Sequence, residues 1–192
     1  SSSGDTDAVS DCIEITVCGY DLYEAESLKD EAHPLVPYHA TEPVIRKRFP
    51  DEDARFSGRL IGGCLDVLVT LLGTRFDQVK AFNERYAQDG ILWFLESCDL
   101  NVMSIRRAVW QLDEAGWFSH VKGFLIGRPL NGEALFGLDQ YDAVTKILKK
   151  YNVPILMDLD IGHLPPMMPL IEGSMADVKI AGNDLTIRME LV

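Results

Sequence analysis

Apolar residues in the second half of the chain form runs that predict buried strands. Three of these runs are continuous and lack the alternation of a strand with one wet face: 91–95, 121–127 and 154–157. Such a run is typical of a strand that is covered on both faces of its sheet. The first run ends at Glu96, so a carboxylate stands directly at the end of a dry strand.

The segments between these runs carry apolar residues at helical spacing. Asn101 is the expected N-cap of one helix, which Gly116 closes, and Asp139 caps a second helix that extends to Tyr151. An alternating order of strands and helices gives parallel strands with right-handed crossovers. We therefore expect the carboxyl ends of the three strands to meet at one edge of a sheet, where ligands bind in α/β folds.

The first 55 residues show a weaker pattern. Residues 12–18 alternate apolar and polar positions, which predicts a half-buried strand. Residues 20–50 carry acidic side chains, prolines and isolated aromatics, which predict a long irregular excursion or lid. Residues 1–11 are polar and acidic and are expected to be disordered or linker-like.

Regular patterning begins again at residue 56. We expect a strand over 56–63, a helix over 64–72 that ends at Gly73, and a short helix within 76–86. Near the C-terminus, Gly-Asn-Asp separates two strand-like segments and predicts a β-hairpin: 177–181 and 185–191. The predicted fold class is α/β, with a parallel sheet, covering helices and an antiparallel C-terminal hairpin.

Charge and composition exclude several kinds of partner. The formal net charge is −12, and such a surface repels the phosphate backbone of a nucleic acid. No apolar run is long enough to span a membrane, so no membrane partner is expected. The four cysteines form no C-x-x-C pair and, with the four histidines, no metal-ligand spacing, so reduced thiols, a cytoplasmic location and no metal or cofactor are predicted.

Two titratable residues are predicted to meet at the ligand-binding edge. His163 lies on a loop that prolines keep from becoming helical, directly after the strand over 154–157. Glu96 ends a neighbouring strand, and a carboxylate there needs a partner. If the two side chains meet, they form the base and orienting half of a hydrolytic triad. The plainer alternatives are a loop histidine that caps a turn and a solvated or helix-capping glutamate.

Several stretches, taken together and in order, resemble one family. They are Gly58-Arg-Leu-Ile-Gly-Gly-Cys-Leu65 with Leu72-Gly-Thr74, Ile91-Leu-Trp-Phe-Leu-Glu96, Ile105-Arg-Arg with Gly116, Gly123-Phe-Leu-Ile-Gly127, and Gly162-His163 with Pro166-Met167 and Gly173. Over about residues 56–192 they resemble the C-terminal domain of the LD-carboxypeptidase family of serine peptidases. That family includes murein tetrapeptide carboxypeptidases, which act in peptidoglycan recycling, and microcin C self-immunity proteins.

The resemblance implies roles for individual residues. Glu96 and His163 are expected to be catalytic members of a Ser-Glu-His triad, and Gly162, Gly63 and Asp160 are expected to bind substrate. The implied activity is hydrolysis of a small peptide, such as the L,D bond of a murein tetrapeptide or a peptide–nucleotide. On the residues alone, Gly62-Gly63 is also explained as a tight strand-to-helix turn without a ligand.

The family's nucleophile is a serine in a Gly-x-Ser-Asp turn of a separate N-terminal domain, and no such turn occurs here. We therefore expect residues 1–55 to be a linker and irregular lid that follows a missing nucleophile domain. Residues 56–192 are expected to be a swivelling β/β/α domain that is inactive alone. Apolar residues at Pro165-Pro166-Met167-Met168 predict either a homodimer or tight binding to the missing domain.

Two other functions remain open from the sequence. One is a non-catalytic binding or regulatory module that retains the fold. The other is a cysteine hydrolase in which Cys64 or Cys98 serves with His163, although acidic neighbours raise the pKa of a thiol and make it less reactive.

Overall fold

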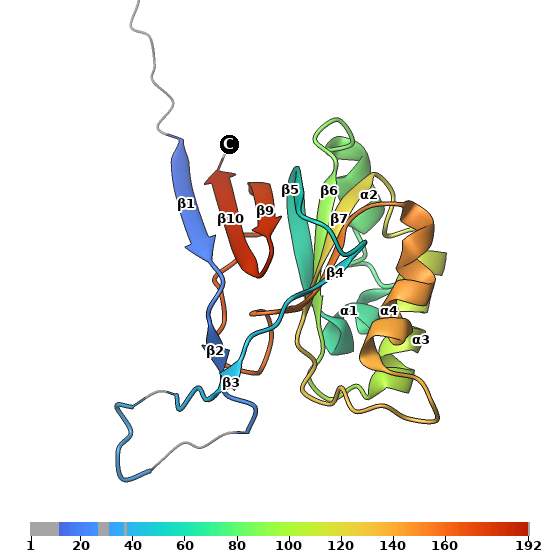
Figure 1. Ribbon diagram of the computed structural model, residues 1–192. Coiled ribbons are helices and arrows are strands. Elements are labelled where there is room, and N and C mark those ends of the chain that lie inside the picture. The colour runs from blue at the N-terminus through green and yellow to red at the C-terminus, as the bar shows by residue number, and fades with distance from the viewer. Residues whose placement is uncertain (1–11, 27–30, 37, 192) are drawn as a thin grey trace, which may run out of the picture.

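A mixed eight-stranded sheet organises the molecule. The computed structural model describes residues 12–26, 31–36 and 38–191, and the sheet runs in the order β1-β10-β9-β5-β6-β7-β8-β4 (Figure 1). Its centre holds the three predicted dry strands, which are parallel as expected: β6 (Ile91–Glu96), β7 (Val121–Gly127) and β8 (Ile155–Leu159). Their carboxyl ends therefore share one edge of the sheet.

The next strand, β5 (Ala54–Cys64), joins the two halves of the sheet. It pairs parallel with β6 and antiparallel with β9 (Met175–Ala181). The hairpin predicted near the C-terminus consists of β9 and β10 (Asp184–Leu191). Its turn contains Gly182, whose φ of 58° suits a glycine.

The helices lie together on one face of the parallel strands (Figure 1). The predicted caps are present: Asn101 Oδ1 accepts from the Ser104 amide at the start of α3 (Val102–Glu114), and Asp139 Oδ1 accepts from Asp142 at the start of α4 (Gln140–Leu148). The remaining helices are short: α1 (Leu65–Leu71), α2 (Val79–Arg85) and the 3-10 turn Lys149–Tyr151. The predicted helix over 64–72 is thus one residue shorter at each end, and the predicted short helix lies within 76–86 as expected.

Two apolar cores divide the fold into layers. One core fills the space between the sheet and the helices and contains Trp93, Trp117 and Phe118, all fully buried. The other lies on the opposite face, where Leu92 and Leu156 of the parallel strands share a cluster with Ile187 of the C-terminal hairpin. The sheet therefore curves so that its C-terminal hairpin packs against the face of the parallel strands that the helices leave free. The layers follow the order β/β/α.

The N-terminal segment differs from its prediction in two ways. β1 (Ile13–Cys18) forms as expected and pairs with β10, but its side chains are mostly exposed rather than half buried. β1 is an edge strand, and no layer of the described residues covers it. Residues 20–50 are not wholly irregular, because β2 (Leu22–Tyr23) pairs with β3 (Glu42–Pro43) and β4 (Lys47–Phe49) pairs with β8. Strands of two or three residues are too short to leave a periodic pattern.

The sheet takes strands from both sides of the predicted domain boundary. That boundary, between residues 55 and 56, falls inside β5, while β1 and β4 form the two edges of the same sheet. The division into a linker and a domain stays a prediction. Residues 1–11 of the predicted linker lie outside the described part of the chain. None of the helices in the described part is both long and apolar enough to cross a membrane.

Candidate functional site

Glu96 and His163 are in contact at the carboxyl edge of the parallel strands. β6 ends in Glu96, and the loop after β8 brings His163 back to it, so that Glu96 Oε2 lies 2.9 Å from His163 Nδ1. The Glu96 side chain is 9% exposed and the His163 side chain 47% exposed. An ionised carboxylate only accepts hydrogen bonds, so Nδ1 is the protonated ring nitrogen that donates to Glu96.

The second ring nitrogen of His163 is available for chemistry. Nε2 has no hydrogen-bond partner among the residues that the structure describes. A neutral imidazole held through Nδ1 presents an unprotonated Nε2, which can take a proton from a nucleophile. The contact therefore has the geometry of a base and its orienting group.

Two glycines allow the loop to lie against Glu96. A side chain at Gly162, whose φ is 114°, would place its Cβ 2.8 Å from Glu96 Oε2. A Cβ at Gly127, the last residue of β7, would lie 2.1 Å from the Ile161 carbonyl oxygen and 3.1 Å from Glu96 Cβ. Gly127 was not among the predicted site residues, although a glycine that ends a buried strand at the ligand-binding edge is a readable signal.

Gly63 lies at the same edge, on the neighbouring strand. It pairs in register with Leu95, one residue before Glu96, and its φ is 143°. The preceding Gly62 is closely packed, since a Cβ there would lie 1.9 Å from the Phe94 carbonyl oxygen. The predicted substrate contacts of Gly63 and Gly162 stay predictions, and the structure places both glycines beside the Glu96–His163 pair.

Asp160 is fully buried beneath the His163 loop. Its two carboxylate oxygens each accept from one arginine, Arg46 Nη2 and Arg128 Nη1, both at 2.6 Å. The Tyr20 amide adds a third hydrogen bond at 3.0 Å. Both carboxylate oxygens of Asp160 are thus hydrogen-bonded to groups of the protein itself. The predicted contact of Asp160 with substrate stays a prediction.

The Asp160 network connects three distant segments. Arg46 lies in the short segment between β3 and β4, and Arg128 directly follows β7. Arg128 Nη2 also donates to the Leu164 carbonyl at 3.3 Å, next to His163. Sequence reasoning missed both arginines. Arg128 had the same signal as Glu96, a charged residue at the end of a dry strand, whereas nothing local marks Arg46.

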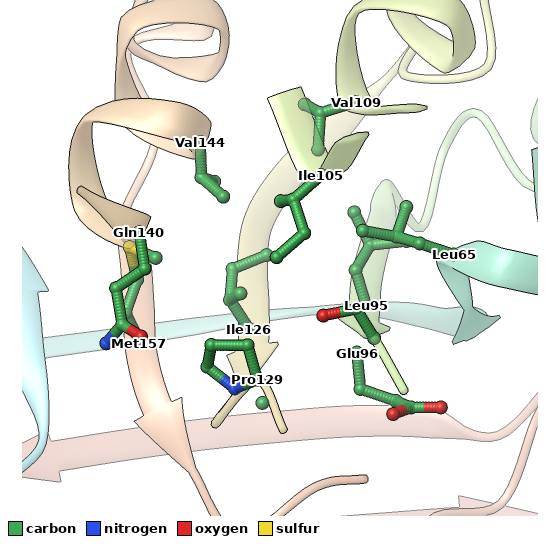
Figure 2. A pocket seen from close by; sticks show the side chains of 12 residues that line it. Leu65, Leu95, Glu96, Ile105, Val109, Ile126, Pro129, Gln140, Val144 and Met157 are labelled. Carbon is green, nitrogen blue, oxygen red and sulfur yellow. The ribbon is translucent and has the colours of Figure 1, made fainter. Parts of the chain in front are cut away.

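A small apolar hollow adjoins Glu96 on the helix side. Its volume is about 20 Å³, room for about one water molecule, and its walls come from β6, β7, α3 and α4. Figure 2 shows the Glu96 carboxylate pointing away from the apolar side chains of Leu95, Ile105 and Ile126. The apolar side chains on this side offer no hydrogen-bond donor, so the Glu96 carboxylate interacts with the His163 loop on the other side.

Neither candidate cysteine is prepared to act as a nucleophile. Burial, followed by the neighbouring Glu96, raises the pKa of the Cys64 thiol to about 12. Burial and then the charges of Asp99, Asp66 and Glu96 also raise the pKa of Cys98. Both thiols are protonated near neutral pH, which argues against a cysteine hydrolase.

Metal ligation has no support in this arrangement. Within residues 12–26, 31–36 and 38–191, no three His, Cys, Asp or Glu side chains are grouped so that they could hold a metal ion.

Comparison with solved structures shows the same fold. The muramoyltetrapeptide carboxypeptidase from Oxalobacter formigenes matches with a TM-score of 0.62 and 18% identity over 92% of this chain and 50% of that one. An MccF-like protein from Bacillus anthracis str. Ames matches with a TM-score of 0.67 and 19% identity, over 93% and 51% of the two chains. The microcin C7 self immunity protein MccF, in complex with aspartyl sulfamoyl adenosine, matches with a TM-score of 0.71 and 19% identity, over 91% and 50%.

The chain spans about half the length of these solved structures. No curated protein matches the sequence. The family defined by the LD-carboxypeptidase C-terminal domain, however, matches residues 57–178, which is more than half of the chain, and so confirms the resemblance read from the sequence. The chain therefore belongs to the LD-carboxypeptidase family, and it carries the C-terminal domain of that family.

Proposed function

We propose that this chain is the C-terminal part of a serine-type carboxypeptidase. In this proposal Glu96 and His163 supply two members of a Ser-Glu-His triad, and the serine comes from outside residues 1–192. The observation that carries the proposal is the 2.9 Å contact between the buried Glu96 carboxylate and Nδ1 of a half-exposed His163. That contact leaves Nε2 open to a second protein segment or to a substrate.

The proposed chemistry follows from this geometry. His163 Nε2 removes the proton from the serine hydroxyl as its oxygen attacks the scissile carbonyl carbon. Glu96 stabilises the resulting imidazolium through Nδ1. His163 then gives the proton to the leaving amine, the peptide bond breaks, and an acyl-enzyme remains. Water, deprotonated by the same nitrogen, hydrolyses the acyl-enzyme and returns the serine to its starting state.

The proposed substrate is a small peptide. Structures with this fold include a muramoyltetrapeptide carboxypeptidase and a microcin C7 self immunity protein in complex with aspartyl sulfamoyl adenosine. The L,D bond before the terminal D-alanine of a murein tetrapeptide is our first candidate. A non-catalytic binding module is the alternative, and the following experiment separates the two.

The test uses the complete natural polypeptide that contains this chain. We expect it to release D-alanine from L-alanyl-γ-D-glutamyl-diaminopimelyl-D-alanine, and Glu96→Gln and His163→Ala to remove nearly all of that activity. A second His–Glu contact on the same chain, His120 Nε2 to Glu84 Oε1 at 3.1 Å, supplies the matched controls Glu84→Gln and His120→Ala. Residues 1–192 alone should be inactive.

Two outcomes would overturn the proposal. A complete polypeptide that binds but does not cleave murein peptides or peptide–nucleotides would favour the non-catalytic module. Turnover that survives both Glu96→Gln and His163→Ala would place the chemistry at another site.

A further inference from the structure

A polar cleft lies beside the candidate active site at the same edge of the sheet. It has a volume of about 310 Å³, at the lower end of the range for small-molecule pockets. Two of its lining residues, Pro129 and Gln140, also line the hollow next to Glu96. A third, Leu164, directly follows His163. The cleft is therefore a neighbour of the Glu96–His163 pair, with a different set of chemical groups.

Asp158 provides the negative charge of the cleft. Its backbone has a φ of 59°, a conformation that residues other than glycine rarely adopt without support from their surroundings. Its carboxylate accepts from the Tyr141 hydroxyl and from Gln140 Nε2, both at 2.7 Å. These donors are neutral, and Asp158 has no ion-pair partner among the described residues.

The electrostatics of Asp158 agree with a carboxylate that no cation contacts directly. Burial raises the pKa of its carboxyl group, although the hydrogen bonds from Tyr141 and Gln140 and the charges of Arg128 and Lys47 work in the opposite direction. A partly buried carboxylate without a cation in contact still carries a desolvation cost. A ligand that brings a positive charge would lower that cost.

Lys47 provides the free positive charge, and Arg128, which is ion-paired with Asp160, lines the same cleft. Lys47 begins β4 and pairs in register with Met157, so it lies at the same end of β8 as Asp158. Within the described part of the chain, its ammonium group takes part in no ion pair. Arg128 is 5% exposed and lies 4.4 Å from the centre of the Tyr23 ring, and its Nε finds no hydrogen-bond partner among the described residues.

The remaining walls are apolar. They are formed by side chains that cannot compete for a charged ligand group: Pro43, Ile45, Pro129 and Leu164. Two opposite charges that line one cleft without an ion pair between them, together with apolar side chains, fit a ligand that carries both charges a short distance apart. A simple anion would meet Asp158 unfavourably, and a simple cation would meet Lys47 unfavourably.

We propose that this cleft binds a free amino-acid group, with the ligand ammonium at Asp158 and the ligand carboxylate at Lys47. Binding at the cleft needs neither a nucleophile nor turnover, so the inference goes beyond the proposed function and does not depend on it. If both hold, a substrate that carries a free amino-acid group away from its scissile bond would reach from the Glu96–His163 pair into the cleft.

The test is a titration of residues 1–192 with three small probes, followed by two-dimensional ¹H–¹⁵N NMR. Alanine, in both enantiomers, carries both charges, propionate lacks the ammonium, and ethylamine lacks the carboxylate. We expect saturable shifts for at least one enantiomer of alanine at the amides of Lys47, Gln140, Tyr141 and Asp158. Propionate and ethylamine should each bind at least about tenfold more weakly, because each loses one charge-assisted contact.

Two variants assign the contacts to named side chains. Asp158→Asn and Lys47→Met should each weaken alanine binding about tenfold or more. Asparagine tolerates a positive φ, so Asp158→Asn is expected to keep the fold, and Lys47 lies on an edge strand where methionine fits. Asp184→Asn and Lys179→Met change the same charges on exposed positions of the C-terminal hairpin and should leave binding unchanged.

Four outcomes would overturn the inference. The first is the absence of saturable binding of either alanine enantiomer. The second is equal binding of alanine and one of the single-charge probes, which would mean that only one charge of the cleft is used. The third is a set of shifts centred on residues outside the cleft. The fourth is alanine binding that is insensitive to both variants.

Discussion

Among the residues that the structure describes, two contacts between histidine and glutamate side chains invite comparison, because their distances are similar and their surroundings differ. His163 Nδ1 lies 2.9 Å from Glu96, and His120 Nε2 lies 3.1 Å from Glu84. The Glu96 side chain is 9% exposed, whereas that of Glu84 is 71% exposed. Glu84 belongs to the surface helix α2, and His120 precedes β7 at the opposite, amino-terminal end of the parallel strands.

The difference shows that the surroundings of a pair decide its chemistry. Water competes for the exposed Glu84 carboxylate, so the His120 contact is a weak surface interaction. Glu96 has a dry wall behind it and little water around it, so its hydrogen bond holds the His163 ring in one orientation. The Glu96 contact also leaves Nε2 of its histidine open, while the Glu84 contact occupies Nε2.

The largest expected effect is on peptidase activity. In the complete polypeptide, His163→Ala should lower kcat/KM for D-alanine release by about ten-thousandfold or more, because the proposed function makes His163 the general base of a triad. His120→Ala removes the ring of the exposed pair and should change kcat/KM less than about twofold, since surface substitutions are usually near neutral. Equal losses in the two variants would show that the pairs do not differ in function.

The support beneath the His163 loop should be the next most sensitive feature. Asp160→Ala leaves the buried guanidinium groups of Arg46 and Arg128 without a counter-charge, which typically costs about 3–5 kcal/mol. Urea unfolding of residues 1–192 measures this loss. Glu84→Gln, which removes an exposed carboxylate, should cost less than about 0.5 kcal/mol. A cost for Asp160→Ala as small as that of Glu84→Gln would contradict the role given to the network.

Thiol reactivity reports on the burial around Glu96. In a variant whose other cysteines are serine, Cys64 should react with an aromatic disulfide reagent roughly thirty- to sixtyfold more slowly than the same chain unfolded in urea. This factor combines a pKa raised from 9.0 to about 12 with the higher intrinsic nucleophilicity of a more basic thiolate. Glu96→Gln should restore part of the rate, and Glu84→Gln should not. A native rate equal to the unfolded rate would exclude the raised pKa.

The smallest expected effect is a pH dependence of stability that comes from Asp158. Burial raises the folded-state pKa of this carboxyl group above its ordinary value, so the folded state takes up the proton first as the pH falls. The free energy of unfolding of the native chain, minus that of Asp158→Asn, should therefore rise as the pH is lowered from 7 toward 4. Urea unfolding at several pH values measures this difference, and Asp184→Asn is the matched control. A difference that falls with acidification would mean that the hydrogen bonds outweigh burial.

Local pattern was sufficient for most of the fold. The continuous apolar runs identified β6, β7 and β8, and Asn101 and Asp139 marked the starts of α3 and α4, because strand burial and helix capping involve neighbouring residues. The alternating order then implied parallel strands and a shared edge for Glu96 and the loop of His163. The LD-carboxypeptidase family was also recognisable from the sequence.

Other features depend on contacts between distant residues. The alternation over 12–18 indicated a strand correctly, but burial of one face of β1 depends on a covering layer that no pattern within the strand reports. β4 is three residues long, and its place at the edge of the sheet follows from its pairing with β8, more than 100 residues away. Lys47 and Asp158 consequently gave no sign in the sequence that they share a cleft.

The sequence by itself determined the elements, their order, the parallel core and the family, because these depend on local periodicity, on capping and on the handedness of crossovers. Only the tertiary structure decided that the expected contact between Glu96 and His163 forms through Nδ1 and that Asp160 is held between Arg46 and Arg128. Such contacts depend on the path of the loops and on the need to compensate each buried charge. Many sequence separations can satisfy that need, so the sequence pattern does not specify which arginines pair with Asp160.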